Sequence, residues 1–362
     1  MSQSGLYVGV DLGGTNIKIG LVNCGGEIIS RCSIPTDEPA GPQAAVDRCA
    51  EAIDRLVEQA EVSKGDLIGL GLATPGTMDI PKGMLLEPPN LPNWSQFPIR
   101  DALAKRVELP VEYANDGTAA AYGEFWVGSG QEMESMIFLT LGTGVGCGII
   151  LSQVNREGEA LAEPNAGSTA QQELRPPTEL GPPVTLLHGV NSHGAECGHL
   201  VVDYSPDARI CGCGRPGHLE AYASATGVVK RTSDGLAAGR SSVLTDRIDD
   251  DNQLSARLVG EAAADGDEFA CEIVLETAMY LGRGIADLIH TIDPSGVVIG
   301  GAMTFGGESS LLGQEFLDEI RRVARGKIFP VLAERTRIDF ARLGSDAGLV
   351  GAAGIARQFL GS

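Results

Sequence analysis

Three short runs near the amino end of the chain are rich in apolar residues, and glycine-rich turns separate them. These runs predict three strands, at 6–10, 17–22 and 27–34. The apolar positions that follow predict, in order, a helix, a strand, a helix, a strand and a helix, at 42–60, 66–73, 98–106, 111–114 and 117–126. The order βββαβαβα is that of the ribonuclease-H-like fold.

A strand, a glycine turn and a second strand return in the middle of the chain. The strands 136–141 and 149–151 flank the turn 142–148, and together they resemble the opening pattern VGVDLGGTNIKIGLV. We therefore expect two ribonuclease-H-like lobes, each with a glycine hairpin whose backbone N–H groups can approach phosphate oxygens. The other predicted elements are helices at 221–238, 253–265, 267–291, 311–325 and 346–360 and strands at 295–299 and 336–340.

The segment 153–185 interrupts this regular order. It is polar and rich in proline and glycine, with little periodicity. We expect a long surface excursion that acts as a lid, forms an oligomer contact or has no function.

The segment 193–220 concentrates residues that bind metal ions. It holds three of the five histidines and two cysteines separated by one residue. Thiolate and imidazole ligands together favour tetrahedral Zn²⁺. The candidate ligands are His199, Cys211, Cys213 and His218. Four protein ligands leave no open position for water, so the site would be structural. The alternative is two buried free cysteines beside two polar histidines.

Charge and composition narrow the classes of function. The chain has 362 residues, which favours two domains, and its formal net charge is −21. This charge argues against nucleic-acid binding and against an anionic membrane surface. The amino end lacks the charged and apolar regions of a signal peptide, and no apolar run reaches the ~18 residues of a membrane span. We expect a cytoplasmic protein with no nucleic-acid or membrane partner.

Several short motifs, in this order and spacing, resemble the ROK family of sugar kinases. They are DLGGTN (11–16), TPGTMD (74–79), ND (115–116), GTGVG (142–146), ECGH (196–199), CGCGRPGHLE (211–220), GG (300–301) and DAGL (346–349). The segment LEAYASATG (219–227) looks most like the bacterial glucokinase branch. One departure is clear: the family has a third cysteine in the pattern CxCGxxGC, where this chain has His218.

The resemblance covers nearly the whole chain and implies an actin-like ATPase fold with two lobes. The smaller lobe would comprise 1–120 plus 346–362 and the larger 121–345, with a nucleotide and sugar cleft between them. The implied activity is glucokinase, the ATP-dependent phosphorylation of glucose at its 6-hydroxyl, which belongs to glycolysis. The implied cofactors are ATP, Mg²⁺ and structural Zn²⁺, and the implied assembly is a homodimer.

The resemblance also implies roles for particular residues. Asp116 would be the general base, although an aspartate there could also cap a helix, and both can hold. Asp11 would orient Mg²⁺. The other nucleotide contacts would be Gly13, Gly14, Thr15, Lys18, Gly142, Thr143, Gly144, Gly300 and Gly301. The sugar contacts would be Gly76, Asn90, Asn115, Asp116, Glu196, His199 and Glu220. For Glu220 the alternative is a carboxylate that favours a helix amino terminus.

Three other functions stay open. One is a kinase for another sugar, such as N-acetylmannosamine, fructose or allose. A second is a ROK transcriptional repressor, which carries a DNA-binding helix-turn-helix before the sugar domain. The strand that begins at Leu6 and the acidic charge argue against it. The third is a sugar-binding protein without catalysis, against which Asp116 and the two glycine turns argue.

Overall fold

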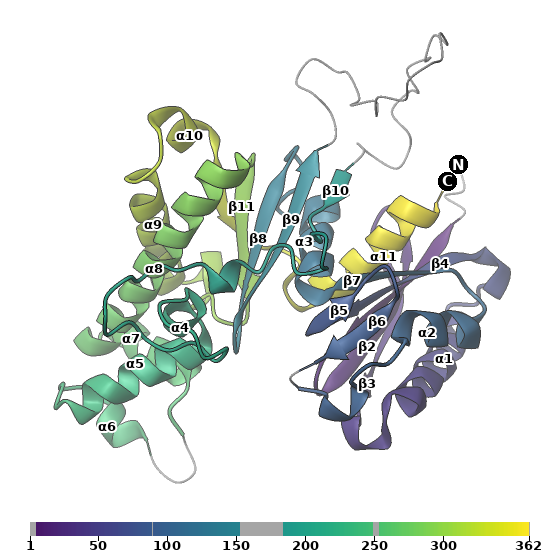
Figure 1. Ribbon diagram of the computed structural model, residues 1–362, viewed down its shortest axis with the longest axis horizontal. Coiled ribbons are helices and arrows are strands. Elements are labelled where there is room, and N and C mark those ends of the chain that lie inside the picture. Colours follow the sequence, from purple (N-terminus) through teal and green to yellow (C-terminus); the bar gives the residue numbers. More distant parts are fainter. Residues whose placement is uncertain (1–4, 89, 153–183, 249–252, 362) are drawn as a thin grey trace. The chain divides into compact units, whose positions relative to one another are not determined.

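The computed structural model describes residues 5–88, 90–152, 184–248 and 253–361. The chain forms two compact units (Figure 1). Unit 1 contains 1–127, 148–194 and 346–362, and unit 2 contains 128–147 and 195–345. Of the excursion expected at 153–185, residues 153–183 lie outside the described residues.

Unit 1 is built on a five-stranded sheet with the order β3-β2-β1-β4-β7. The first three strands pair antiparallel, and β4 and β7 continue the sheet parallel to β1. The strands are β1 (Leu6–Leu12), β2 (Asn16–Asn23), β3 (Ile28–Pro35), β4 (Leu67–Thr74) and β7 (Val111–Asn115). Unit 1 also contains a two-stranded hairpin, β5 (Thr77–Asp79) with β6 (Met84–Glu87).

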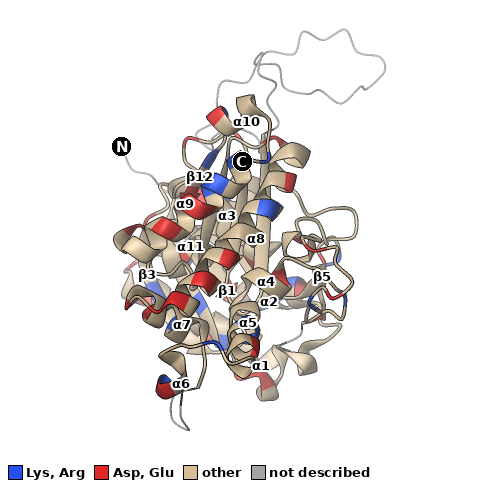
Figure 2. Ribbon diagram, turned by 90° about the vertical axis from the view of Figure 1, so that its left-hand side faces the viewer, with Lys and Arg blue, Asp and Glu red and all other residues tan. Residues whose placement is uncertain are grey.

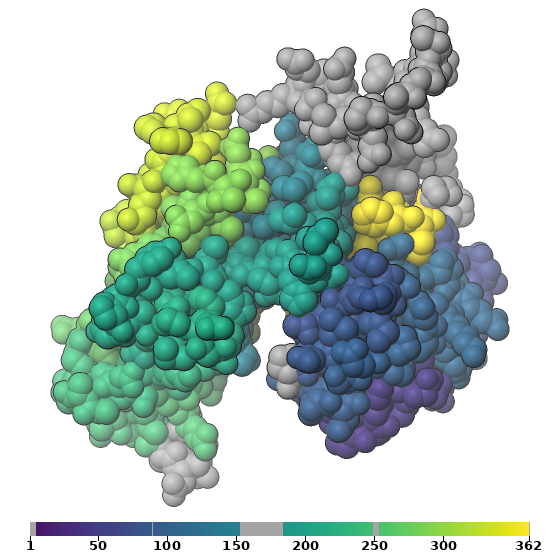
Figure 3. Space-filling view, viewed as in Figure 1, coloured from purple at the N-terminus to yellow at the C-terminus, as the bar shows by residue number. Residues whose placement is uncertain are grey.

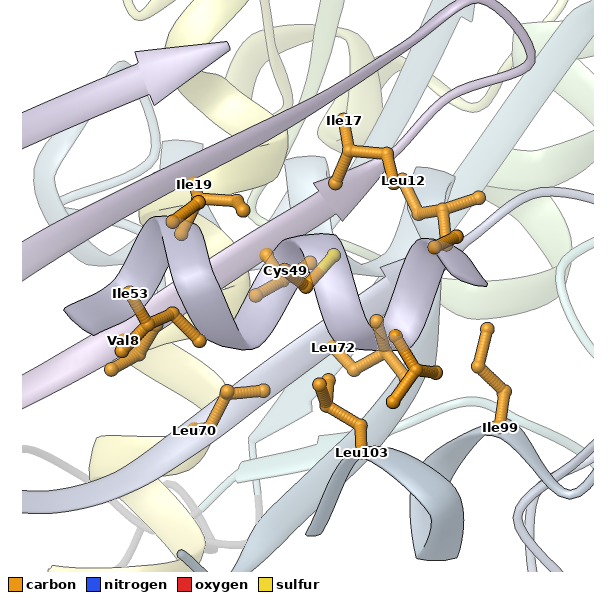
Figure 4. Close-up of a cluster of buried hydrophobic side chains, with 14 of the residues drawn as sticks. Val8, Leu12, Ile17, Ile19, Cys49, Ile53, Leu70, Leu72, Ile99 and Leu103 are labelled. Carbon is orange, nitrogen blue, oxygen red and sulfur yellow. The ribbon is translucent and has the colours of Figure 1, made fainter. Parts of the chain in front are cut away.

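Helices cover both faces of this sheet, as the period of two in β1 requires. Val8, Val10 and Leu12 are buried in the core that contains the apolar face of α1 (Pro42–Gln59) (Figure 4). That core also contains side chains of α2 (Ile99–Val107). The residues between them, Gly9 and Asp11, face α11 (Ala347–Leu360). The remaining helix of unit 1 is α3 (Asp116–Val127).

Glycines let α11 lie unusually close to its neighbours. A side chain at Gly9 would overlap the carbonyl oxygen of Leu349, and one at Gly71 would overlap that of Ala352. Gly351 of α11 approaches Ala119 of α3 in the same way. The glycine- and alanine-rich sequence of this helix is therefore explained by backbone-to-backbone packing within unit 1.

The second five-stranded sheet repeats the strand order of the first, as β10-β9-β8-β11-β12. β9 and β10 pair antiparallel, and β11 lies parallel to both β8 and β12. Its strands are β8 (Met136–Leu141), β9 (Val145–Ser152), β10 (Val184–Leu186), β11 (Gly296–Gly301) and β12 (Arg337–Phe340). The chain passes from unit 2 to unit 1 within β9. The repeated strand order confirms the predicted duplication.

The residues 195–220, which contain the four candidate metal ligands, are called the metal-ligand segment below. The helices of unit 2 begin at the end of this segment. They are α4 (Glu220–Ala223), α5 (Ala225–Ala237), α6 (Leu244–Arg247), α7 (Ala256–Ala264), α8 (Glu268–Ile292), α9 (Leu311–Arg325) and α10 (Pro330–Arg335). Within the described ranges, no helix has both the length and the apolar character to cross a membrane. Acidic positions, red in Figure 2, are spread over many elements, in keeping with the negative net charge.

The two units differ in their bounds from the lobes expected from the sequence. A boundary at residue 120 would divide α3, which instead belongs whole to unit 1. The physical reason is the close packing of α3 on α11, where a side chain at Gly123 would approach the carbonyl oxygen of Ala347 to 2.5 Å. The described parts of 148–194 also belong to unit 1. At Gly148 this stretch packs against α3, where a side chain would approach the Gly117 carbonyl oxygen to 2.6 Å.

Candidate functional site

The first glycine turn lies in unit 1, at the tip of the hairpin of β1 and β2. Gly14 and Thr15 are exposed there, and the Gly13 N–H donates to the Asn16 carbonyl at 2.9 Å. Thr36, which is fully buried, fixes the tip: its hydroxyl donates to the Gly13 carbonyl at 2.6 Å and its N–H to the Thr15 carbonyl at 2.9 Å. The motif did not predict Thr36, because the register that pairs Pro35 with Asn16 is visible only in the structure.

Asp11 and Lys18 lie directly opposite one another in the register of β1 and β2. A side chain at Gly348, in the first turn of α11, would lie 2.6 Å from an Asp11 carboxylate oxygen. The carboxylate therefore lies against the amino terminus of this helix, which favours negative charge. Burial raises the pKa of the Asp11 carboxyl, and the Lys18 charge opposes that shift.

Asn115 and Asp116 stand where β7 ends and α3 begins. The N–H of Gly117 donates to Oδ1 of both side chains, at 2.8 Å each. Asp116 is the first residue of α3, so the bond with N-cap geometry is the one that Asn115 accepts. The Asp116 carboxylate has a fixed place at the strand end. The structure does not test whether Asp116 also accepts a proton.

A buried hydrogen bond between Tyr113 and Thr74 links the ends of β7 and β4. The Tyr113 hydroxyl and that of Thr74 are 2.8 Å apart, and both side chains are buried. Burial raises the pKa of Tyr113 to about 12, and the hydrogen bond to Thr74 partly offsets the shift. This bond joins β7 to Thr74 at the end of β4, two residues before Gly76, whose φ is +88°.

Asn90 lies beside the first glycine turn. A side chain at Gly14 would approach the Asn90 Cβ to 3.2 Å, and Asn90 is exposed. Unit 1 therefore brings together two residues that the sequence assigned to different ligands, Gly14 to the nucleotide and Asn90 to the sugar.

The second glycine turn lies in unit 2, between β8 and β9, and the segment that begins α5 holds it. The Gly142 N–H donates to the Gly144 carbonyl at 3.0 Å and closes the turn. The Ala225 N–H donates to the Gly142 carbonyl at 2.8 Å, and the Thr226 hydroxyl donates to the Thr143 carbonyl at 2.9 Å. The carbonyls of Gly142 and Thr143 thus accept hydrogen bonds from the start of α5.

Glu220 connects this turn to the metal-ligand segment. Its Oε2 accepts from the Val145 N–H at 3.1 Å, and a side chain at Gly144 would overlap the same oxygen. Its Oε1 lies 3.4 Å from the Sγ of Cys211, which donates to it. The carboxylate therefore has two fixed neighbours in unit 2, which the helix-terminus interpretation did not foresee.

The four candidate metal ligands converge in unit 2. One ligand atom from each of His199, Cys211, Cys213 and His218 lies within 4.8 Å of the others. The Sγ of Cys213 and Nδ1 of His218 are 3.2 Å apart. In Figure 3 the chain from 195 to 220, in teal, lies on the surface of unit 2 turned to the viewer.

The local backbone explains why these four residues meet. Val201 and Ile210 pair with His218 and Pro216 in two isolated antiparallel bridges, which bring the two ends of the segment together. Gly214 and Gly217 adopt φ of +83° and +80°, which only glycine does without strain. Tyr222 fixes the base of the segment, because its hydroxyl donates to Asp203 Oδ2 at 2.5 Å and accepts from the Arg209 N–H at 2.8 Å.

The donor set fits a zinc ion. Two thiolates and two imidazoles around Zn²⁺, at bond lengths of about 2.0 to 2.3 Å, lie roughly 3.3 to 3.8 Å from one another. The observed spread of 4.8 Å therefore needs only a small inward movement of the side chains. Glu196 Oε2 lies 3.7 Å from His199 Nδ1 and raises the pKa of this imidazole. A carboxylate beside one ring nitrogen would leave the other for a metal.

Gly300 and Gly301 have a structural explanation of their own. Gly301 has a φ of +92°, and a side chain there would overlap the backbone of Leu141. A side chain at Gly300 would lie 2.9 Å from Ala341 and from the ring of Phe138. Both glycines are therefore needed at the end of β11 whether or not a nucleotide binds near them.

An open groove of about 490 Å³ runs along the first half of α8, away from all of these residues. Its lining includes Glu268, Cys271, Leu275 and Met279, and it contains none of the described candidate residues. The groove is therefore no guide to the chemistry of this protein.

Comparison with known proteins identifies relatives over the whole length. The model of the ROK family matches residues 7–174 and 184–359. The glucokinase of Halalkalibacterium halodurans is 34% identical over 97% of this chain and 95% of its own length. The glucokinase of Thermotoga maritima is 31% identical over 98% of both chains. The crystal structure of a ROK family glucokinase from Streptomyces griseus, in complex with glucose and AMPPNP, matches with a TM-score of 0.70 and 32% identity over 98% of this chain and 100% of its own.

More distant relatives have other activities. An N-acetylmannosamine kinase of Haemophilus influenzae is 27% identical over 95% of this chain and 93% of its own length. A xylose repressor of Caldicellulosiruptor bescii is 26% identical over 96% of this chain and 77% of its own length. The fold is therefore the actin-like ATPase fold predicted from the motifs, whereas proteins that share it differ in their sugar.

Proposed function

Because the chain belongs to the ROK family, we propose that it is an ATP-dependent sugar kinase that phosphorylates glucose at the 6-hydroxyl group. The observation that carries this proposal is the position of Asp116, a carboxylate fixed at the carboxyl end of β7 in a fold that presents a glycine turn in each half. The full-length similarity to two glucokinases, at 34% and 31% identity, supports glucose as the sugar.

Asp116 would act as the general base. A sugar hydroxyl is a weak nucleophile, and a carboxylate that takes its proton as it attacks the γ-phosphate of ATP helps the transfer. Gly117 N–H holds one carboxylate oxygen of Asp116 at 2.8 Å, which keeps the base in one orientation. Asn115 would hold the sugar from the neighbouring position, and Gly76 and Asn90 would line its pocket.

The two glycine turns would bind the phosphates. The exposed tip at Gly14 and Thr15 would offer backbone N–H groups in unit 1. In unit 2 the Gly142 N–H closes the turn, and Thr143 and Gly144 would offer theirs. Asp11, beside the start of α11, would orient Mg²⁺, which supplies charge neutralisation at the phosphates when bound. Lys18 faces Asp11 across the strands and would contact the phosphates.

The metal-ligand segment would present the remaining sugar contacts. Zn²⁺ bound by His199, Cys211, Cys213 and His218 would hold the segment, and Glu196 and Glu220 would grip adjacent hydroxyls. A site that pairs each buried polar group with a sugar hydroxyl rejects analogues that lack the hydroxyl. The proposal includes a cytoplasmic homodimer, for which light scattering of the purified protein is the test.

The experiment is a coupled assay of ADP release across a panel of sugars that includes glucose, N-acetylmannosamine, fructose and allose. We expect glucose to be turned over with the highest kcat/KM. Asp116→Asn should lower kcat by about 10² to 10⁴ because it removes the proton acceptor. Asp101→Asn, an exposed carboxylate on α2 of the same unit, is the matched control and should keep wild-type kcat.

Two outcomes would contradict parts of the proposal. If another sugar is turned over and glucose is not, glucose is excluded as the substrate, and the proposed sugar kinase activity stands. Wild-type kcat in Asp116→Asn would exclude Asp116 as the base. Circular dichroism of the variant separates a catalytic loss from a loss of the helix start that Asp116 also supports.

A further inference from the structure

The carboxylate of Glu220 lies between two parts of unit 2 that serve different ligands in the proposed function. On one side is the glycine turn, where Oε2 accepts from the Val145 N–H at 3.1 Å. On the other side is the segment that carries the candidate sugar contacts, where Oε1 lies 3.4 Å from Cys211 Sγ. A movement of the Glu220 side chain therefore affects both the glycine turn and the metal-ligand segment.

The same short segment holds the turn at two more points. Glu220 begins α4, and within six residues Ala225 N–H and the Thr226 hydroxyl bind the carbonyls of Gly142 and Thr143, at 2.8 and 2.9 Å. Ser224, whose side chain is buried, caps the start of α5, because its hydroxyl accepts from the Gly227 N–H at 3.0 Å. The stretch from Glu220 to Thr226 thus fixes the turn through one N–H and two carbonyls.

We propose that Glu220 is a positioning residue that couples the sugar site to the second phosphate turn, so that a bound sugar raises the affinity for nucleotide. A sugar hydroxyl donated to Glu220 would hold the carboxylate in one rotamer. That rotamer keeps the Val145 N–H and the neighbouring turn in place before the nucleotide arrives, and a preordered turn costs less entropy to bind. The inference rests on the proposed function, because it needs a sugar at Glu220 and phosphates at the turn.

Coupling of this kind is reciprocal, so it is measurable from either ligand. The measured quantity is the ratio of the AMPPNP dissociation constants without and with saturating sugar, by calorimetry on the full chain. The sugar is the one that the substrate panel identifies. For the wild type we expect a ratio of about 10, within the range of roughly 5 to 150 found for coupled sites.

Two variants should bring this ratio close to 1. Glu220→Gln weakens the charged hydrogen bond to the Val145 N–H. Gly144→Ala places a side chain where Glu220 Oε2 now lies and so displaces the carboxylate from the turn without changing it chemically. The control is Gly65→Ala on the surface of unit 1, because a side chain there meets only Ser63 Oγ, at 3.5 Å. Gly65 has no proposed ligand contact, so the ratio of this variant should stay near the wild-type value.

A second measurement needs no variant. Sugar alone should slow amide hydrogen exchange in the peptide that covers 142–147, which contains none of the proposed sugar contacts. Suppose that a sugar binds and is phosphorylated, but the ratio of the AMPPNP dissociation constants is 1 and this peptide is not protected. The coupling role of Glu220 would then be rejected, and the proposed kinase activity would stand. A wild-type ratio retained in Glu220→Gln and Gly144→Ala would reject it too. If no sugar of the panel binds the wild type, the proposed function and the coupling are both overturned.

Discussion

Tyr113 illustrates how a single buried side chain links the stability of unit 1 to pH. Its pKa is raised from 10.0 to about 12, chiefly by burial, so the folded state holds the phenolic proton more tightly than the unfolded state does. The sign follows: stability is full below pH 10 and falls as the pH rises from 10 toward 12. Two pKa units correspond to about 3 kcal/mol over that window.

We predict that Tyr113→Phe is destabilised at pH 8 but loses less stability than the wild type between pH 10 and 12. The cost at pH 8 should be about 1 to 2 kcal/mol, because the buried Thr74 hydroxyl loses its partner. Urea unfolding followed by circular dichroism at pH 8, 10 and 12 measures the free energy of unfolding of both proteins. Tyr204→Phe is the control, since that side chain is 86% exposed. Equal alkaline losses in wild type and Tyr113→Phe would refute the assignment.

At the scale of the residue, the sequence predicted groups that a motif names and missed groups that only support them. His199, Cys211, Cys213 and His218 were chosen by residue type and spacing, and their ligand atoms converge within 4.8 Å. The Nδ1 of His218, which departs from the family pattern, lies 3.2 Å from the Sγ of Cys213. Thr36 and Tyr222 were missed, because a buried hydroxyl that binds a distant backbone group leaves no periodic signal in the sequence.

At the scale of the element, α11 is the clearest case of a helix whose sequence is set by its neighbours. Gly351 approaches Ala119 of α3 so closely that a side chain would overlap the Ala119 carbonyl oxygen. The obstacle is backbone, and a shift of either helix would disturb the packing of α11 on β1 and β4.

We predict that Gly351→Ala destabilises the protein by about 3 kcal/mol or more, at or above the upper end of the usual range for overpacking. The helix-propensity gain of about 1 kcal/mol for alanine over glycine is too small to compensate. The control is Gly65→Ala, where the nearest atom is Ser63 Oγ at 3.5 Å. Thermal unfolding measures both variants, and a stability change of Gly351→Ala no larger than that of Gly65→Ala would contradict this account of the helix packing.

The sequence predicted long elements well and short ones poorly. The helix expected at 311–325 is α9 with the same bounds, and the five strands of each sheet were expected except β10. β5, β6, β10, α6 and α10 were missed, each with three to six residues. Such pieces are too short for a period to appear, and their backbone partners come from other parts of the chain, as β9 does for β10.

At the scale of the whole molecule, the two units share one strand order but differ in what holds them. Unit 1 rests on α1 and α11 packed against the two faces of its sheet. Unit 2 carries the segment 195–220, in which the described residues form two isolated bridges and one 3₁₀ turn, Cys197–His199. A segment with so little regular structure needs another source of order, and a metal ion held by the four candidate ligands would supply it.

We predict that metal removal loosens unit 2 locally and leaves the core of unit 1 unchanged. The protein prepared without chelator should contain one zinc per chain, measured by mass spectrometry of the metal. After chelation, amide exchange should speed up in 195–220, and also in 142–147 because Glu220 joins the segment to the turn there. Exchange in α1, which belongs to unit 1, should not change.

Substitutions at His218 separate the metal from other sources of order. His218→Ala should lose zinc and reproduce the fast exchange of the chelated protein, whereas His218→Cys, which restores the family pattern, should keep one zinc per chain. His290→Ala is the control, because His290 lies at the end of α8 outside the ligand set. Zinc well below one per chain in the wild type, or slow exchange of 195–220 that chelation does not change, would show that hydrogen bonds alone hold the segment. The bridges at Val201 and Ile210 and the hydroxyl of Tyr222 would then have to account for the convergence of the four side chains.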